Sequence, residues 1–471
     1  MIPLHDRLLG PLQGHALPLK EHGLYTFVTN GDNCTQRETK GRKEIKINLR
    51  KMKSIFYLCF LIAGIHGERP CQQNSNDNNS TENYHGGNRN QVGPANENML
   101  GHKVERSICQ FAFNFYKEAS SQRNNKNVIF SPISVSTAFA MLSLAAKSET
   151  LQEIFNVLHF KPNEIQQGEI HEGFHQLMQS QNRQNANFQL DMGNVLFVKD
   201  QLKLQQQFLN DLKNFYSGEA FPENFKNVRP AQQKINNYIE KKTHGKIINL
   251  LNNLDPTTEI LLLSYVYLKA TWNKTFNPKY TKEDDFFVDG NTVVKVPMMF
   301  RMGMCKRAYD AQLSSTVVQM DYKEESIKAY FILPDEGQMR KLENGLSCES
   351  LTKWRKLLSE SSTNLYLPRF SVHGRFDLKQ ILYSLGIRKV FTNEADLSGI
   401  TGQPGHEISE AIHQAMVNVD ENGTEASAAS TMEIVPMSVP VTVIVNRPFM
   451  LVVVKDGAIL FMGKILNPVE Q

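Results

Sequence analysis

Residues 421–438 read Glu-Asn-Gly-Thr-Glu-Ala-Ser-Ala-Ala-Ser-Thr-Met-Glu-Ile-Val-Pro-Met-Ser, and this stretch decides the fold. Every second residue from Thr424 to Ile434 is small at first and larger later, whereas the alternate set carries both acids, Glu425 and Glu433. This period of two is typical of a β-strand with one buried face, although Ala and Ser have weak strand propensity. The pattern predicts a loop that a sheet would accept as a strand. An ordinary polar loop before a strand stays open as the alternative.

The composition is that of a large globular protein. A chain of 471 residues with 41% hydrophobic content can bury a large core, and a net charge of +4 does not call for a nucleic-acid partner. There is no Gly-x-Ser-x-Gly elbow, metal-binding His pair or phosphate loop, so we expect no enzyme, cofactor or metal. One disulfide is compatible with the six cysteines, which contain no C-x-x-C pair, but the sequence leaves its pairing open. They are Cys34, Cys59, Cys71, Cys109, Cys305 and Cys348.

The first hundred residues have the pattern of a secretory leader and a tail. A basic start at residues 51–53 precedes about a dozen mostly apolar residues, too short a run to span a bilayer comfortably. We expect residues 52–67 to be a signal peptide, translation to start at Met52, and residues 1–51 to be a non-native N-terminal extension. The polar stretch 68–102 is predicted to be disordered. An internal buried strand or an anchor is the alternative for the apolar run.

Residues 103–471 mix helical and strand patterns without a linker. Val104, Ile108, Phe111 and Phe115 fall at helical spacing, and Ser131 followed by proline predicts the start of a second helix. Helical patterns recur around 208–215 and 235–248. Strand-like runs occupy 260–268, 329–333, 365–367, 439–445, 450–454 and 459–465, the last two joined by a turn at Gly457. The predicted class is α+β in one large domain.

The segment Gly423 to Ala429 resembles the hinge of the inhibitory serpins. Asn446-Arg447-Pro448-Phe449 and Phe461 to Pro468 resemble the C-terminal signature of that family, and the likeness covers residues 103–471. It is greatest to the antitrypsin-like plasma branch, clade A. The resemblance implies a serpin fold of three β-sheets and about nine helices, with an exposed reactive-centre loop near the C-terminus. It also implies a secreted, monomeric glycoprotein that inhibits extracellular serine proteases, with no nucleic-acid or membrane partner.

The resemblance places the bond that the target protease cleaves, here called the bait bond, at Met437-Ser438. A long apolar methionine suits the pocket of an elastase-like or chymotrypsin-like protease, and Val435 and Pro436 would support that contact. After cleavage the upstream loop is expected to insert into the main sheet and trap the protease as a covalent complex. The implied loop hinge comprises Glu421, Gly423, Thr424, Glu425, Ala426, Ser427, Ala428 and Ala429.

Four further residues resemble mechanical parts of the serpin sheet. Ser134, Asn236 and His413 resemble the polar shutter that controls sheet opening, and Trp272 resembles the breach tryptophan where the loop inserts. Ser264 departs from the family pattern, in which asparagine is common at that position. A lone histidine among apolar residues is also compatible with an ordinary core residue, so that alternative stays open.

Sequons and one basic segment suggest surface modifications and contacts. Asn78, Asn79 and Asn273 begin possible glycosylation sites, and a further sequon at Asn422 lies in the hinge, where we expect no glycan in active protein. A weak heparin contact is possible where Trp354 is surrounded by cations, although a solvated helix face explains the same pattern. Those cations are Lys353, Arg355 and Lys356.

A non-inhibitory carrier is the main alternative function. Residues 318–322 and 333–339 also resemble the serpins that carry thyroxine or corticosteroids. Those carriers often have bulkier or acidic hinge residues, whereas this hinge stays small. A serine hydrolase is the third alternative function, although the sequence lacks the Gly-x-Ser-x-Gly elbow.

Overall fold

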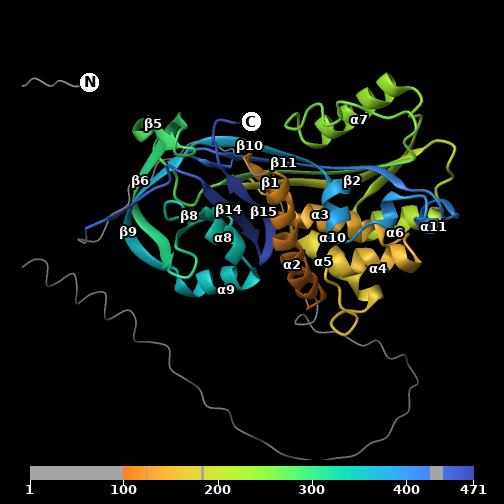
Figure 1. The fold of residues 1–471 in the computed structure, drawn as a ribbon, viewed down its shortest axis with the longest axis horizontal. Helices are drawn as coiled ribbons and strands as arrows, with labels where there is room; N and C mark the ends of the chain where they lie inside the picture. Colours follow the sequence, from red (N-terminus) through yellow and green to blue (C-terminus); the bar gives the residue numbers. More distant parts are fainter. Residues whose placement is uncertain (1–98, 124, 182–184, 425–438, 471) are drawn as a thin grey trace, which may run out of the picture. The chain divides into compact units, whose positions relative to one another are not determined.

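The computed structural model describes residues 99–123, 125–181, 185–424 and 439–470 (Figure 1). The expected leader, extension and sequons at Asn78 and Asn79 therefore lie outside the described residues, as do residues 425–438. Helix α2 (Met99–Gln122) begins four residues before the expected boundary at 103. It buries Val104, Ile108, Phe111 and Phe115, as their helical spacing predicted.

The main sheet has six strands. Its order is β10-β11-β4-β2-β3, and the short strand β12 pairs with the end of β4. Strands β4 and β11 are neighbours and run parallel, which leaves no chain segment between them. The bounds are β2 (Phe188–Lys199), β3 (Glu219–Glu223), β4 (Ile260–Thr271), β10 (Phe370–Asp377), β11 (Ile408–Val419) and β12 (Gly423–Thr424).

The second sheet has nine strands in the order β1-β15-β14-β8-β7-β6-β9-β13, with β5 paired to β6. Strand β6 spans 18 residues and pairs with β5 over its first residues, with β9 along its middle and with β7 over its last residues. It therefore joins two of the three sheets of the expected fold into one ladder. The bounds are β1 (Val128–Phe130), β5 (Lys282–Phe287), β6 (Val293–Asp310), β7 (Ser315–Asp321), β8 (Ile327–Pro334), β9 (Ser359–Pro368), β13 (Val441–Ile444), β14 (Phe449–Lys455) and β15 (Ala458–Ile465).

The described residues contain ten α-helices, against about nine expected. Helix α7 covers one face of the main sheet, which we call the outer face, and α3 with its neighbours covers the other (Figure 1). The remaining bounds are α3 (Pro132–Leu142), α4 (Ser148–Val157), α5 (Gln167–Gln181), α6 (Gln206–Tyr216), α7 (Val228–Lys242), α8 (Met339–Gly345), α9 (Cys348–Leu357), α10 (Leu378–Leu385) and α11 (Ser398–Thr401).

The core divides along the faces of the main sheet. Alternate β4 residues point to opposite faces, as the period of a strand requires. Leu262, Val266 and Leu268 join the large core with α2 and α3, whereas Leu261 and Leu263 pack with α7 in a smaller cluster. Helices thus cover both faces of the central strand β4, and the predicted α+β class is confirmed.

A disulfide joins α2 to α9. Cys109 and Cys348 are bonded across 239 residues of sequence, which answers the pairing that the sequence left open. Cys305 is buried and free. Within the described ranges no helix is long and apolar enough to cross a membrane.

Candidate functional site

The hinge turn at residues 420–423 reverses the chain after β11. The backbone N–H of Asp420 donates to the carbonyl of Gly423 at 2.9 Å, and the Asp420 carboxylate accepts the N–H groups of Asn422 and Gly423 at 2.7 and 3.0 Å. Gly423 has φ +148°, and a Cβ there would lie 2.1 Å from the carbonyl oxygen of Ala270. Only glycine fits this position, because the turn approaches β4 backbone to backbone.

Thr424 is already seated in the main sheet. Strand β12 pairs antiparallel with β4, with Gly423 opposite Thr271 and Thr424 opposite Ala270. The Thr424 side chain is fully buried, and its hydroxyl is 3.0 Å from the hydroxyl of Tyr322. The chain therefore follows the direction that a strand between β4 and β11 would take.

Trp272 donates two hydrogen bonds to the hinge turn. Its backbone N–H donates to the Asn422 carbonyl at 2.8 Å, and its indole N–H donates to the Asp420 carbonyl at 3.1 Å. Its ring stacks on Tyr322 with a centroid separation of 4.2 Å. Since Tyr322 also contacts Thr424, Trp272 lies beside the start of the loop, and its role as the breach tryptophan stays a prediction.

Glu421 anchors the other side of the turn. Its side chain is 5% exposed and accepts a hydrogen bond from the Thr281 hydroxyl at 2.7 Å. The guanidinium of Arg369, at the start of β10, lies 3.6 Å from the same carboxylate oxygen. Neither Thr281 nor Arg369 was singled out from the sequence, because residues this far apart in the chain carry no local signal of their contact.

His413 and Ser134 are linked through Ser264 at the seam between β4 and β11. The Ser131 backbone N–H donates to His413 Nε2 at 3.0 Å, so the neutral ring carries its proton on Nδ1, which lies 3.1 Å from the hydroxyl oxygen of Ser264. Ser264 is in turn 2.8 Å from the Ser134 hydroxyl. Burial lowers the pKa of His413 to about 3, because the charged ring would lose its hydration. These side chains form one buried polar chain across the seam.

Asn236 does not belong to that group. It lies on α7, where its amide donates to the Leu251 carbonyl at 2.9 Å and its amide oxygen accepts the Leu251 N–H at 2.8 Å. Helix α7 covers the outer face, whereas Ser264 and His413 point to the opposite face. The expected grouping with Ser134 and His413 is therefore wrong. Ser264, noted only as a departure from the family pattern, lies opposite His413 in the ladder.

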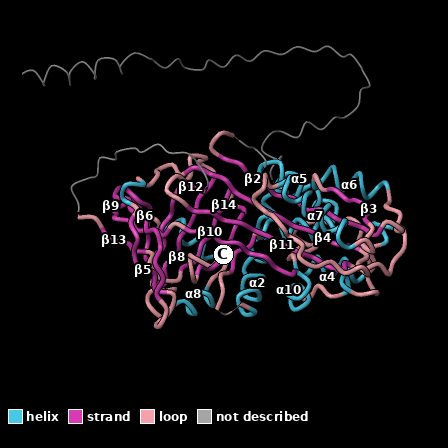
Figure 2. Tube along the Cα trace, turned by 90° about the horizontal axis from the view of Figure 1, so that it is seen from above, coloured by secondary structure: helices cyan, strands magenta, loops and turns pink. Residues whose placement is uncertain are grey.

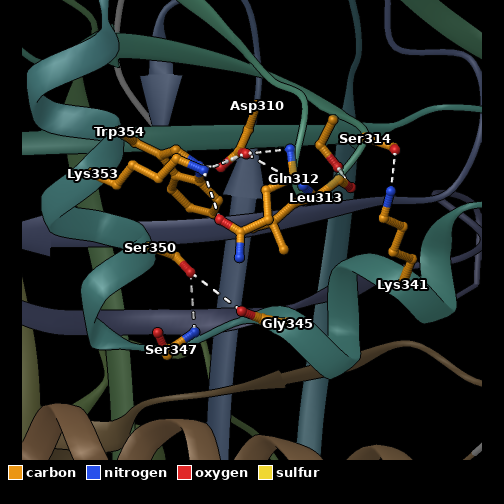
Figure 3. Close-up of polar contacts among 11 residues, drawn as sticks. Asp310, Gln312, Leu313, Ser314, Lys341, Gly345, Ser347, Ser350, Lys353 and Trp354 are labelled. Carbon is orange, nitrogen blue, oxygen red and sulfur yellow. Dashed lines mark hydrogen bonds and ion pairs between the residues drawn. The ribbon is translucent and has the colours of Figure 1, made fainter.

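The basic segment on α9 is partly neutralised. Lys353 Nζ lies 2.6 Å from one oxygen of the buried Asp310, and the Trp354 indole N–H donates to the other at 2.8 Å (Figure 3). Burial alone would raise the pKa of Asp310, but these hydrogen bonds outweigh it and lower the pKa. Of the three cations of this segment, Arg355 and Lys356 are exposed and form no ion pair within the described residues, so the heparin contact stays a prediction with fewer cations to support it.

The remaining predicted residues divide between described and undescribed parts. Asn273 is exposed at the end of β4, whereas the threonine of the Asn422 sequon is buried. The bait bond Met437-Ser438, its supports Val435 and Pro436, and the hinge residues Glu425, Ala426, Ser427, Ala428 and Ala429 lie outside the described residues. The described part of the chain contains no cluster of three or more side chains that could hold a metal ion.

Comparison with known proteins assigns the chain to a family. A family model described as "Serpin (serine protease inhibitor)" matches residues 106–468. An alpha-1-antitrypsin-like protein of Tamias sibiricus is 43% identical over 80% of this chain and 91% of that protein. Alpha-1-antitrypsin of Sus scrofa is 42% identical over 79% of this chain and 88% of that protein.

Solved structures agree with this assignment. Human thyroxine-binding globulin complexed with thyroxine aligns with a TM-score of 0.76 and 37% identity, covering 79% of this chain and all of that one. Human glycosylated kallistatin aligns with a TM-score of 0.74 and 36% identity over 79% of this chain and all of that one. The fold, the family match and the relatives agree: the chain belongs to the serpin (serine protease inhibitor) family and is alpha-1-antitrypsin-like.

Proposed function

We propose that this protein is a secreted suicide-substrate inhibitor of serine proteases with elastase-like or chymotrypsin-like specificity. The single observation that carries the proposal is the seating of Thr424 in the main sheet, opposite Ala270 and next to the parallel pair β4 and β11. A loop whose first residue already pairs with β4 needs only to separate these two strands in order to continue inward. The proposed bait bond is Met437-Ser438.

The register of β12 sets how far an inserted loop would reach. With Thr424 opposite Ala270, each later loop residue pairs with one earlier β4 residue, so Ile434 would come opposite Ile260, the first residue of β4. Small or apolar residues at Ala426, Ala428 and Met432 would then face the core side together with Thr424. Pro436 would pass beyond the end of β4, where its missing N–H removes no ladder hydrogen bond.

The energy for this movement would come from new backbone pairing. Roughly ten ladder hydrogen bonds, each contributing about 1 kcal/mol net, together with burial of the small face, would favour the inserted form. An acyl-linked protease at Met437 would be carried about 3.3 Å per inserted residue towards the far end of the sheet. Distortion of its catalytic groups would then prevent hydrolysis of the acyl bond.

A protease panel tests this proposal. We expect incubation with pancreatic elastase or chymotrypsin to give a denaturant-resistant adduct and to release a peptide beginning at Ser438. Met437→Arg should transfer this behaviour to trypsin, because a long cation fills an acidic specificity pocket. Simple cleavage at the bait without an adduct, for every protease in the panel, would contradict the proposed trapping.

The carrier alternative is kept because the structural relatives include thyroxine-binding globulin. It predicts saturable binding of thyroxine or a corticosteroid at a one-to-one ratio and no adduct with any protease. The same panel with a ligand titration separates the two functions.

A further inference from the structure

A basic groove lies on the outer face of the main sheet, beside the hinge turn. It has a volume of about 620 Å³, and Tyr267 and Lys269 of β4 form part of its lining. Lys246, in the segment after α7, and Lys323, in the turn after β7, also line the groove. Three lysines from separate parts of the chain thus converge on one hollow, which Gln189 of β2 and Asp420 of the hinge turn also line. Figure 2 labels β2, β4 and β12 of the main sheet.

Two of these cations have no counter-charge in the described part of the protein. Lys269 and Lys323 are exposed, and neither forms an ion pair with any residue in the described ranges. His244 also lines the groove, with Asp191 at 3.5 Å. Asp420 is the one acid among the described lining residues, and its carboxylate is occupied by the N–H groups of the hinge turn. The groove therefore carries an excess of positive charge.

Tyr267 gives an independent sign of a missing ligand. The residue is 2% exposed, and its buried hydroxyl has no hydrogen-bond partner among the described residues. Its ring lies 5.8 Å from the ammonium of Lys246. A buried hydroxyl without a partner is costly, so an acceptor at this position would be favourable. Asp420, the one acid among the described lining residues, already accepts two N–H groups, so we look to a bound molecule for this acceptor.

We propose that this groove binds a sulfate or phosphate group, with Lys269 and Lys323 supplying the charge and the Tyr267 hydroxyl donating a hydrogen bond. Such a tetrahedral oxyanion offers several acceptors in different directions, which matches donors that approach from two segments, β4 and the turn after β7. A singly charged carboxylate would leave at least one lysine without a counter-charge. The groove lies on the main sheet and is separate from the basic segment of α9, where Lys353 already has Asp310 as its partner.

The oxyanion can belong to a sulfated polysaccharide or to a free phosphorylated compound. Titration calorimetry at a fixed ionic strength of about 0.05 M, where surface electrostatics are weakly screened, distinguishes these sources. The probes are a heparin octasaccharide and inorganic pyrophosphate. Binding of both places the recognition in the oxyanion itself, and binding of the octasaccharide alone assigns the groove to a polymer.

The key variant is Lys269→Ala with Lys323→Ala, and the matched control is Lys203→Ala with Lys213→Ala, two exposed lysines outside the groove and outside α9. Both pairs remove two positive charges from exposed positions. We expect at least a tenfold loss of affinity in the groove variant and less than a twofold change in the control. Tyr267→Phe should weaken binding several-fold without altering net charge, and circular dichroism and melting temperature verify that each variant is folded.

Two results would overturn the proposal. One is the absence of binding by either probe to the unmodified protein. The other is an equal loss of affinity in the groove and control variants, which would mean that only the overall charge attracts the anion. Because the measurement is of binding, it stands apart from the protease panel, and either proposal can fail without the other.

Discussion

Replacing Thr424 by arginine should convert the proposed inhibitor into a substrate. Thr424 is fully buried, pairs with Ala270 and contacts the Tyr322 hydroxyl at 3.0 Å. An arginine at this position would have to bring its charge into the sheet beside the Trp272–Tyr322 stack. The two acids of the adjacent hinge turn, Glu421 and Asp420, already have partners.

The size of the effect follows from the desolvation of that charge. Removing a guanidinium from water without a partner costs about 4 kcal/mol after relaxation. If this cost falls on the first step of insertion, the step slows about a thousandfold, because each 1.36 kcal/mol changes a rate tenfold. Total insertion would remain favourable, since roughly ten new backbone hydrogen bonds form later. Hydrolysis of the acyl bond would nevertheless finish first.

The assay compares adduct and cleaved product on a denaturing gel after incubation with elastase. Thr424→Arg should give cleaved protein and almost no adduct. Thr424→Val is the matched control: it keeps the size of the side chain, loses only the hydroxyl contact at a cost of about 1 kcal/mol, and should keep most of the adduct. Undiminished adduct formation by Thr424→Arg would refute the reasoning that insertion begins at this residue.

Three further predictions concern stability and ligand binding. Burial lowers the pKa of His413 to about 3, below its usual value near 6.5, so on acidification the unfolded chain takes up a proton that the native chain does not. Stability should therefore fall as pH drops below 6.5, by about 3 kcal/mol at pH 4.5, and His413→Gln should lose this part of the pH dependence in urea unfolding. Removing the Cys109–Cys348 bond by a double alanine substitution should lower the free energy of unfolding by up to about 5 kcal/mol, given the 239-residue separation, and an unchanged urea midpoint would contradict this. Cleavage at Met437 should weaken pyrophosphate binding in the groove, because continuing the β12 register brings the acid Glu425 opposite Lys269. Equal affinity before and after cleavage, in protein whose melting temperature has risen, would count against that register.

Local patterns predicted most of the elements near the hinge. The helix that starts after Ser131 is confirmed, and the Ser131 hydroxyl caps it by accepting the Ser134 N–H. The Gly457 turn is confirmed as a two-residue link between β14 and β15. Such features depend on residues close in sequence, where propensity and hydrogen bonding act directly. The Asn422-Gly423 pair is a turn signal of the same kind and could have predicted the reversal after β11.

Contacts across the sheet were beyond local patterns. Asn236 was grouped with His413 by resemblance to the serpin shutter, but the sheet separates them. Which face α7 covers depends on tertiary packing, and the sequence period alone does not specify it. The same limit explains why Tyr322, a partner of both Trp272 and Thr424, was not identified. Its role depends on a bridge between residues a hundred positions apart.

The register of β12 separates two tasks along a single stretch of chain. If Ile434 lands opposite the first residue of β4, residues 424–434 are constrained by fit to the sheet, whereas Val435, Pro436 and Met437 are not. Substitutions at these three positions can then change which protease is recognised without weakening the insertion that traps it. In protein engineering, residues 435–437 could be exchanged together to change specificity while residues 424–434 are kept unchanged.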